Sequence, residues 1–450
     1  MAKFLSIFTM RNLLVLSLAL NLSLIMRVFF DGEKQGFFFS AEQRGPSMAE
    51  DKEAHATQRT LQSVSSSSGQ EGMEKVINLD HGDPTMYEKY WMMMGERTTV
   101  VIPGWHSMSY FSDVKNLCWF LEPEFAKQVF RLHRVVGNAV TEGRHIVVGT
   151  GSSQLILAAL FALSPKDGSE PMSVVSTAPY YSSCIGSCLI ISLQSYPVMS
   201  NHLKSGLYVW AGDARSFNKE GPYIELVTSP NNPDGFVRHS MVNRTGGILV
   251  HDLAYYWPQY TPISSPADHD LTLFTVSKAT GHAGTRIGWA LVKDAEVAKK
   301  MVKFIELNTI GVSRDSQLRA AKILEVMTNT TEIGSSDSGE SFFEIIYHLM
   351  AERWRLLQAA VNNGSMFSLP DFAPGFCHFL QQETQPQPAF AWLKCEDDAV
   401  EDCESFLKGH KILTRGGRSF GVSPKYVRIS MLDRDINFSL FLKRLSIIQS

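Results

Sequence analysis

Short apolar runs separated by polar turns recur along the middle of the chain. Residues 146–148, 223–228, 246–252 and 271–276 are rich in Val, Ile, Leu or Phe, and each run leads into glycine or polar residues. Runs of this length, bounded by turn residues, indicate buried strands. A longer apolar stretch at residues 155–163 indicates a helix. Strands that alternate with helical stretches predict an α/β fold.

A glycine-rich loop at residues 149–154 joins the first of these strands to the helix. The free amides and positive dipole end of a helix N-terminus favour an anion there. Ser152 and Ser153 add hydroxyl donors, although either serine could simply cap the helix. The loop is not a nucleotide P-loop, because no Gly-Lys-Ser/Thr follows it.

The run at 271–276 leads into Ser277 and Lys278, then into a glycine-rich turn that ends at Arg286. Partial desolvation at the end of a buried strand lowers the pKa of an amine, which suits a lysine to Schiff-base chemistry. Hydroxyls, glycine amides and an arginine are the groups that bind a phosphate. Lysine and phosphate site together suggest pyridoxal 5'-phosphate, and the alternative is a basic turn after a strand.

Two further strand ends carry groups that this cofactor needs. Asp252 ends the run at 246–252, and a carboxylate there could keep a pyridine nitrogen protonated. Tyr255, or an asparagine in the turn at 229–235, could donate to the phenolate oxygen of the cofactor. Alone, Asp252 could be a helix cap and the second segment only a turn. Three successive strand ends with suitable groups favour the cofactor.

Longer segments carry a resemblance to a known family. They lie at residues 78–85, 108–113, 116–123, 148–152, 228–235, 251–258, 277–289 and 427–432. In these segments the chain resembles the alliinase/tryptophan aminotransferase-related family of plants, whose members are fold-type I enzymes that use pyridoxal phosphate. The match runs from about residue 76 to the C-terminus. It is most similar to the membrane-anchored members, which convert L-tryptophan to indole-3-pyruvate in auxin synthesis.

The resemblance implies a role for each matching residue. Lys278 would bind the cofactor covalently and move the alpha proton of the substrate. Asp252 would pair with the pyridine nitrogen, while Asn232 and Tyr255 would bond the phenolate oxygen. The phosphate would be bound by Ser152, Ser153, Thr275, Ser277 and Arg286, with Tyr110 reaching across from a partner subunit.

Two further roles concern the substrate and the cofactor ring. Arg428 would bind the alpha-carboxylate as a bidentate clamp, which a lysine could not reproduce. Tyr181, rather than its neighbour Tyr180, would stack on the cofactor ring. The alternatives left open are that Tyr110 and Tyr181 are core aromatics and that Arg428 forms a surface ion pair.

The resemblance also implies a domain organisation. A large domain at residues 126–315 would hold a mainly parallel sheet with the cofactor at its strand ends. A smaller domain would combine residues 76–125 with 316–450, and the active site would lie at a homodimer interface. A chain of 450 residues with 44% hydrophobic content can bury such a core. A net charge of −3 without a basic cluster gives no reason to propose nucleic acid as a partner.

The first 75 residues differ in character from the rest. Residues 13–30 are mostly apolar and, at about 27 Å of helix, would nearly cross a bilayer if Arg27 extends to the interface. We therefore expect residues 1–30 to be a single-pass anchor in the endoplasmic reticulum membrane; a cleaved signal is the alternative. Residues 31–75 are polar and are expected to form a flexible linker.

The six cysteines and the segment at residues 184–195 need separate interpretation. Six cysteines without framework spacing argue against a disulfide scaffold, and six free thiols would favour a cytosol-facing domain. Residues 184–195 look inserted beside Tyr181 and are apolar where a loop should be polar. Cys184 and Cys188 could suggest a metal or redox site, but no His or Asp cluster accompanies them, so we expect no metal.

Three functional alternatives share this cofactor site. An alliinase-type C–S lyase would eliminate a beta substituent instead of transferring the amino group. A second possibility is an aminotransferase for another aromatic amino acid. A third is an inactive regulatory homologue, if the segment at 184–195 disrupts the site.

Overall fold

The computed structural model describes residues 75–165, 170–182, 207–242, 244–334 and 341–449. The chain divides into two units, Met1–Ser66 and Ser67–Ser450, and all described residues belong to the second. The expected anchor at 1–30, nearly all of the linker at 31–75 and the segment at 184–195 lie outside the described residues. None of the helices within the described ranges has the length and apolar character to cross a membrane.

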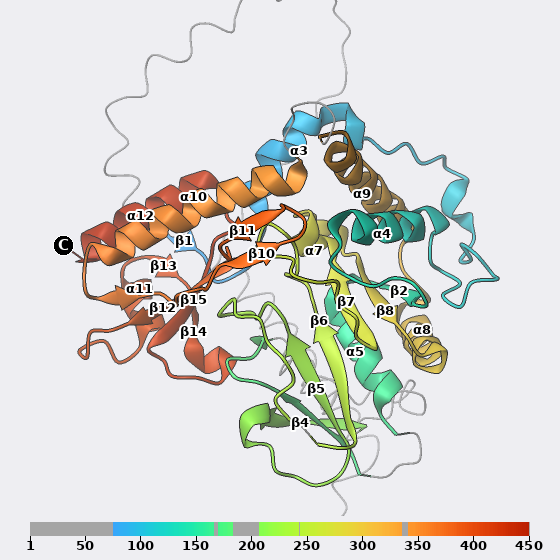
Figure 1. The fold of residues 1–450 in the computed structure, drawn as a ribbon, viewed down its shortest axis with the longest axis horizontal. Coiled ribbons are helices and arrows are strands. Elements are labelled where there is room, and N and C mark those ends of the chain that lie inside the picture. The colour runs from blue at the N-terminus through green and yellow to red at the C-terminus, as the bar shows by residue number, and fades with distance from the viewer. Residues whose placement is uncertain (1–74, 166–169, 183–206, 243, 335–340, 450) are drawn as a thin grey trace, which may run out of the picture. The chain divides into compact units, whose positions relative to one another are not determined.

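A seven-stranded sheet forms the centre of the larger part of this unit (Figure 1). Its order is β2-β8-β7-β6-β5-β3-β4, and the pairs from β4 through β7 are parallel, whereas β8 is antiparallel to both of its neighbours. The mainly parallel α/β sheet confirms the predicted fold class. The strands are β2 (His145–Gly149), β3 (Met172–Ser176), β4 (Tyr208–Asp213), β5 (Tyr223–Thr228), β6 (Gly247–Asp252), β7 (Leu271–Thr275) and β8 (Gly288–Val292).

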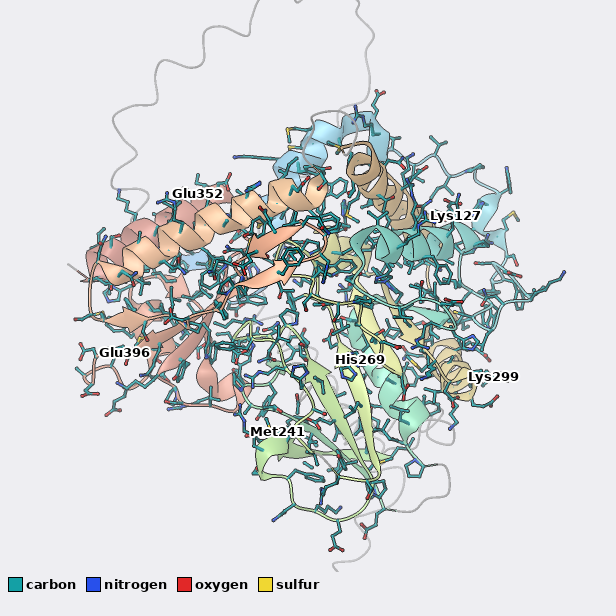
Figure 2. All side chains as sticks on the ribbon, in the orientation of Figure 1. Lys127, Met241, His269, Lys299, Glu352 and Glu396 are labelled. Carbon is teal, nitrogen blue, oxygen red and sulfur yellow. A yellow bond between two sulfur atoms is a disulfide. The ribbon has the colours of Figure 1, made fainter. Side chains whose placement is uncertain are left out.

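Helices pack against this sheet, and side chains fill the space between them (Figure 2). Every residue of β5 and β7 is buried, as expected for central strands of a sheet that is covered on both faces. Asp294 caps α8 by accepting from the amides of Glu296 and Val297. The helices of this part are α4 (Pro123–Val136), α5 (Gly151–Leu163), α7 (Val276–Ala279), α8 (Ala295–Thr309) and α9 (Arg314–Gly334).

A second, antiparallel sheet has the order β14-β15-β12-β9. Its strands are β9 (Phe367–Ser368), β12 (Phe390–Cys395), β14 (Arg415–Gly416) and β15 (Tyr426–Ser430). The long helices α10 (Phe342–Asn362) and α12 (Asp435–Gln449) lie side by side near it (Figure 1). Shorter elements complete this part: α3 (Glu88–Met94), α11 (Cys403–Gly409), and the hairpin of β10 (Gly375–Cys377) and β11 (Gln382–Thr384).

The start of the described chain lies with its C-terminal part. β1 (Ile77–Asn78) pairs in parallel with β13 (Ile412–Leu413), and the Ser430 amide donates to the Leu79 carbonyl at 2.9 Å. These contacts join the two segments that the resemblance assigns to the small domain. The domain boundaries themselves stay a prediction.

The expectation of six free thiols is wrong for one pair. Cys395 at the end of β12 forms a disulfide with Cys403 at the start of α11, and both are fully buried. Their spacing of eight residues carries no recognised disulfide signature, and only the packing of α11 beside the second sheet brings them together. Cys118 and Cys377 are free and buried, whereas Cys184 and Cys188 lie outside the described residues.

Candidate active site

A pocket of about 180 Å³ opens at the carboxyl ends of β5, β6 and β7, beside the start of α5. In open α/β sheets, ligands bind at this edge of the strands. All of the predicted cofactor-binding residues except Tyr110 line the pocket, and three residues that were not predicted line it too. The lining consists of Ser152, Ser153, Tyr181, Thr228, Asn232, Asp252, Ala254, Tyr255, Thr275, Ser277, Lys278, Ala283 and Arg286.

Lys278 lies on the one-turn helix α7, just before the glycine-rich turn. The Thr275 hydroxyl accepts from the Ser277 amide, and this cap starts the helical turn. Lys278 Nζ donates to the carbonyl of Gly82 at 2.5 Å. Burial, and then the nearby Arg428 charge, lower the pKa of Lys278 from 10.5 to about 8. A buried amine of this kind can act as a nucleophile or a base near neutral pH.

Asp252 ends β6 inside the pocket. Burial raises the pKa of its carboxyl group from 3.8 to about 6, although the Ala254 amide, which donates to Oδ1 at 3.1 Å, opposes this shift. A cationic group beside the carboxylate would lower that pKa again. A protonated ring nitrogen is such a group.

Asn232 connects two other predicted residues. Its Nδ2 donates to the Tyr255 hydroxyl at 3.3 Å, and its Oδ1 accepts from Arg428 Nη1 at 3.0 Å. Burial raises the pKa of Tyr255 well above its usual value, so the phenol keeps its proton and remains a donor. The amide and the phenol therefore meet at one corner of the pocket.

Arg428 is 3% exposed, so it is not a surface arginine. It lies on β15, and its Nη2 donates to the Asp80 carbonyl. Its guanidinium carbon is 4.2 Å from the centroid of the Phe390 ring and 5.4 Å from that of Phe420. Burial lowers the pKa of this arginine to about 10. Its Nε is buried and has no hydrogen-bond partner among the described residues, which leaves a donor for a bound anion.

The opposite end of the pocket is suited to a phosphate. α5 begins at Gly151, where φ is +75°, and Ser152 and Ser153 follow in its first turn. A Cβ at Gly151 would lie 2.5 Å from Arg286 Nη2, so only glycine lets the guanidinium lie against this helix end. The Thr275 and Ser277 hydroxyls are 3.1 Å apart at the neighbouring strand end. Helix amides, hydroxyls and an arginine together favour an anion.

Some residues of the site carried no usable sequence signal. Thr228 lines the pocket, and its buried Oγ1 has no hydrogen-bond partner among the described residues. Its position at the end of β5 was visible in sequence, but a strand-end threonine is too common to single out. The Asp80 and Gly82 carbonyls are backbone groups, which only the folded chain can place beside Arg428 and Lys278.

The two other predicted tyrosines, Tyr181 and Tyr110, lie in different places: only Tyr181 lines the pocket. Tyr181 lines the pocket, whereas the Tyr180 ring packs edge-on against Trp210 at 5.0 Å. Tyr110 is 69% exposed and lies away from the pocket of its own chain, in a separate hollow lined by Ser109, Ile310 and Arg314 among others.

These residues fit pyridoxal 5'-phosphate. A lysine with a lowered pKa faces the pocket, and a buried carboxyl with a raised pKa can pair with a ring cation. The unpartnered Thr228 hydroxyl and the anion-favouring end of α5 would each find a partner in such a ligand. The donor set thus matches the cofactor at its carbonyl, ring and phosphate.

Comparisons with known proteins agree with this assignment. A family model described as "Allinase" matches residues 77–449. "Tryptophan aminotransferase-related protein 2" of Arabidopsis thaliana is 55% identical over 442 residues, which cover 97% of this chain and 96% of the relative. "Tryptophan aminotransferase-related protein 1" of Oryza sativa subsp. japonica is 56% identical over 391 residues, 85% of this chain and 86% of the relative. "Alliin lyase 1" of Allium sativum is 36% identical over 368 residues, 79% and 72% of the two chains.

Solved structures share the fold at low sequence identity. The aspartate aminotransferase of Thermotoga maritima has a TM-score of 0.54 and 17% identity, covering 83% of this chain and 92% of that chain. Substrate-bound BacF of Bacillus subtilis has a TM-score of 0.58 and 15% identity, covering 83% and 91%. The shared fold confirms the fold class predicted from the sequence.

Proposed function

We propose, from the premise that this chain belongs to the allinase family, that it is an aminotransferase that uses pyridoxal phosphate to convert L-tryptophan to indole-3-pyruvate. A 2-oxo acid such as pyruvate would accept the amino group, and the product would serve auxin biosynthesis. One observation carries the proposal above the others. Relatives that are 55–56% identical over most of both chains bear the name tryptophan aminotransferase-related protein.

The cofactor supplies a carbonyl carbon that links to amines and a ring that withdraws electrons from the substrate. The chain would hold it by the groups that meet in the pocket. Asp252 would keep the ring nitrogen protonated, and that cation would in turn lower the raised pKa of the carboxyl. Asn232 and Tyr255 would donate to the phenolate oxygen, and Tyr181 would stack on the ring. The phosphate would lie at the start of α5 between Ser152, Ser153, Thr275, Ser277 and Arg286.

Lys278 would move the proton of the substrate. With a pKa of about 8, the Lys278 amine is uncharged in about one molecule in ten at pH 7. The uncharged amine could take a proton from the alpha carbon of the substrate. The carbonyl of Gly82, which accepts from Nζ in this structure, would hold the amine in place between transfers. The same buried amine would bind the resting cofactor covalently.

Arg428 would bind the alpha-carboxylate of the substrate. Its guanidinium is fixed on one side by Asn232 and Asp80 and on its face by Phe390, so its position is set before the substrate binds. The free Nε would donate to one carboxylate oxygen. An arginine held in this way orients the alpha carbon toward Lys278.

We also propose a homodimer and a membrane anchor. Tyr110 is exposed and does not line the pocket of its own chain, which supports a role in the site of a second copy. The anchor at residues 1–30 rests on sequence alone, because that segment lies outside the described residues. The argument for a cytosol-facing domain relied on six free thiols, and the Cys395–Cys403 disulfide removes it.

The second candidate function is a C–S lyase of the alliinase type. It is favoured by the alliin lyases of Allium sativum and Allium cepa var. aggregatum, which are 35–36% identical to this chain. An inactive homologue would follow only if residues 184–195 disrupt the site beside Tyr181.

One experiment separates these candidates. The purified protein is incubated with cofactor, tryptophan and pyruvate, and indole-3-pyruvate and alanine are measured; a parallel reaction contains an S-alkyl cysteine sulfoxide, and pyruvate release is measured. Indole-3-pyruvate supports the aminotransferase, and pyruvate from the sulfoxide supports the lyase. Lys278→Ala is the control for both. Bound cofactor without either product would support an inactive homologue or an aminotransferase for another aromatic amino acid, and a reaction with phenylalanine or tyrosine in place of tryptophan separates these two.

A further inference from the structure

Residues 109–112 form a bend, here called the Tyr110 turn, on an exposed stretch between α3 and α4. Apolar side chains along this stretch face solvent: Trp105 is 70% exposed, Met108 83% and Val114 72%. Within the turn the Ser109 hydroxyl accepts from the Phe111 amide at 3.1 Å, and the Ser112 amide donates to the Trp119 carbonyl at 3.0 Å. Hydrogen bonds therefore hold the backbone of the turn, while Tyr110 is 69% exposed and does not line the pocket of its own chain.

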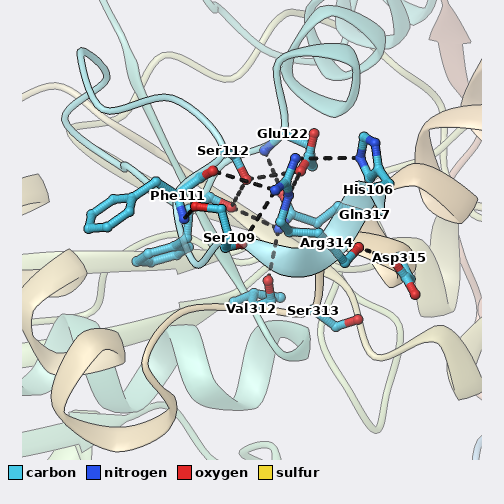
Figure 3. Close-up of polar contacts among 12 residues, drawn as sticks. His106, Ser109, Phe111, Ser112, Glu122, Val312, Ser313, Arg314, Asp315 and Gln317 are labelled. Atoms are coloured by element: carbon cyan, nitrogen blue, oxygen red, sulfur yellow. Dashed lines mark hydrogen bonds and ion pairs between the residues drawn. The ribbon is translucent and has the colours of Figure 1, made fainter. Parts of the chain in front are cut away.

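Arg314, the first residue of α9, lies under this turn (Figure 3). Its Nη1 donates to the carbonyl of Ser109 at 3.3 Å and to that of Phe111 at 3.5 Å. These are the two carbonyls on either side of Tyr110. Nη1 serves both carbonyls while Nε of the same guanidinium donates to Glu122, and the single nitrogen of a lysine could not span the turn and the carboxylate in this way.

Glu122 and its neighbours also hold the guanidinium in place. Arg314 Nε donates to Glu122 Oε1, and the two side chains are only 15% and 5% exposed. The Ser112 hydroxyl donates to the same carboxylate oxygen at 2.9 Å, and Gln317 of α9 accepts from the Glu122 amide at 2.8 Å (Figure 3). Since the pair is largely buried and hydrogen-bonded on several sides, loss of one partner would leave the other charge uncompensated.

We infer that the Arg314–Glu122 pair is a positioning device for Tyr110. It holds the Tyr110 turn so that the phenol projects from the subunit toward the cofactor phosphate in a second copy of the chain. This inference rests on the proposed function, which places Tyr110 in the site of the partner. Arg314 itself contacts neither cofactor nor substrate and acts only through the turn.

A double-mutant cycle on cofactor affinity tests the inference. Apo protein is titrated with pyridoxal phosphate, and the dissociation constant is read from quenching of protein fluorescence. Tyr110→Phe should weaken binding about 10- to 100-fold, since it removes one hydrogen bond to a charged group. Arg314→Gln should weaken binding at least about tenfold. The double variant should be no weaker than Tyr110→Phe alone, because both changes remove the same contact.

Controls separate positioning from general damage. Arg355→Gln removes an exposed arginine that pairs with Glu352 on α10, and it should leave cofactor affinity unchanged. Arg314→Lys keeps the charge beside Glu122 and should lose affinity nearly as Arg314→Gln does; it also replaces Arg314→Gln if that variant does not fold. Sedimentation shows whether each variant keeps the oligomeric state of the parent.

Hybrid dimers give a second readout. One subunit carries Lys278→Ala and the other carries Tyr110→Phe, so the single competent pocket receives its phenol from the Lys278→Ala subunit. Arg314→Gln placed in that subunit should weaken cofactor binding to the competent pocket about tenfold more than the same change in the other subunit. Equal losses in both arrangements, or effects of Tyr110→Phe and Arg314→Gln that simply add, would overturn the inference. If Tyr110→Phe binds cofactor normally, the proposed role of Tyr110 is itself wrong.

Discussion

The ionisation of Lys278 gives the sharpest test of the site, because it can be measured before any substrate is present. Burial and the charge of Arg428 lower its pKa from 10.5 to about 8. In the proposed role the uncharged amine of Lys278 would attack the cofactor, and the lowered pKa makes this form available at lower pH. At pH 7 the neutral fraction rises from about 1 in 3,000 to about 1 in 10, a gain of about 300-fold.

The assay mixes apo protein rapidly with pyridoxal phosphate and follows the absorbance of the covalent link between pH 6.5 and 9.5. The same cofactor reacting with N-acetyl-lysine serves as a reference, and the ratio of the two rates removes the ionisation of the cofactor itself. The protein rate, corrected in this way, should be level up to about pH 8 and should fall above it, because Lys278 is then already uncharged whereas the reference amine is still gaining its uncharged form. The rate at which N-acetyl-lysine reacts with the cofactor should still be rising at pH 9.5, because this amine has an ordinary pKa.

The perturbation is Arg428→Leu, which removes the second cause of the lowered pKa and leaves burial in place. With one positive neighbour gone, the charged form of Lys278 is less disfavoured, so the pKa should rise but stay below 10.5. The bend should therefore move to higher pH, and the rate at pH 7 should fall. A corrected rate without a bend up to pH 9.5, or a bend that Arg428→Leu does not move, would refute the reasoning.

Three further changes test the proposed roles. Lys278→Ala should abolish the absorbance of bound cofactor and reduce turnover far more than the roughly 100- to 10,000-fold typical of one acid–base group, and borohydride should label the Lys278 peptide of the parent protein; a near-normal rate would contradict the assignment. Arg428→Lys should raise KM for tryptophan while cofactor absorbance persists, because the charge remains but the fork held by Asn232 is lost; an unchanged KM means that another group binds the carboxylate. Asp252→Asn should lower kcat about 100- to 1,000-fold, the scale of losing one electrostatic partner at a reacting group, with bound cofactor measured separately; an unchanged kcat would remove Asp252 from the mechanism.

The sequence predicted the parts of the site that depend on strand ends. Asp252 and Lys278 follow apolar runs that form β6 and β7, and parallel neighbouring strands bring their carboxyl ends to one edge of the sheet. The glycine-rich loop before α5 could also be predicted, because its local sequence places the free amides of a helix N-terminus there. Arg428 was identified from the resemblance alone, because no local pattern distinguishes it on β15.

The parts that the sequence did not predict depend on contacts between distant segments. The β12–β15 pairing places Phe390 beside Arg428, and the return of the N-terminal segment places the Asp80 and Gly82 carbonyls at the site. Arg314 lies about 200 residues from the turn that it binds, with separations of 205 and 203 residues to Ser109 and Phe111. Such contacts are set by the packed fold and leave no periodicity or spacing in the chain.

The site is thus divided between two sheets that can vary separately. The groups proposed for the cofactor lie on the edge of the parallel sheet, whereas Arg428 and Phe390 belong to the antiparallel sheet. The two sets are joined where Arg428 donates to Asn232 and where Lys278 donates to Gly82. If Arg428 binds the substrate as proposed, changes in the antiparallel sheet or the N-terminal segment would reorient the substrate while leaving the proposed cofactor pocket unchanged.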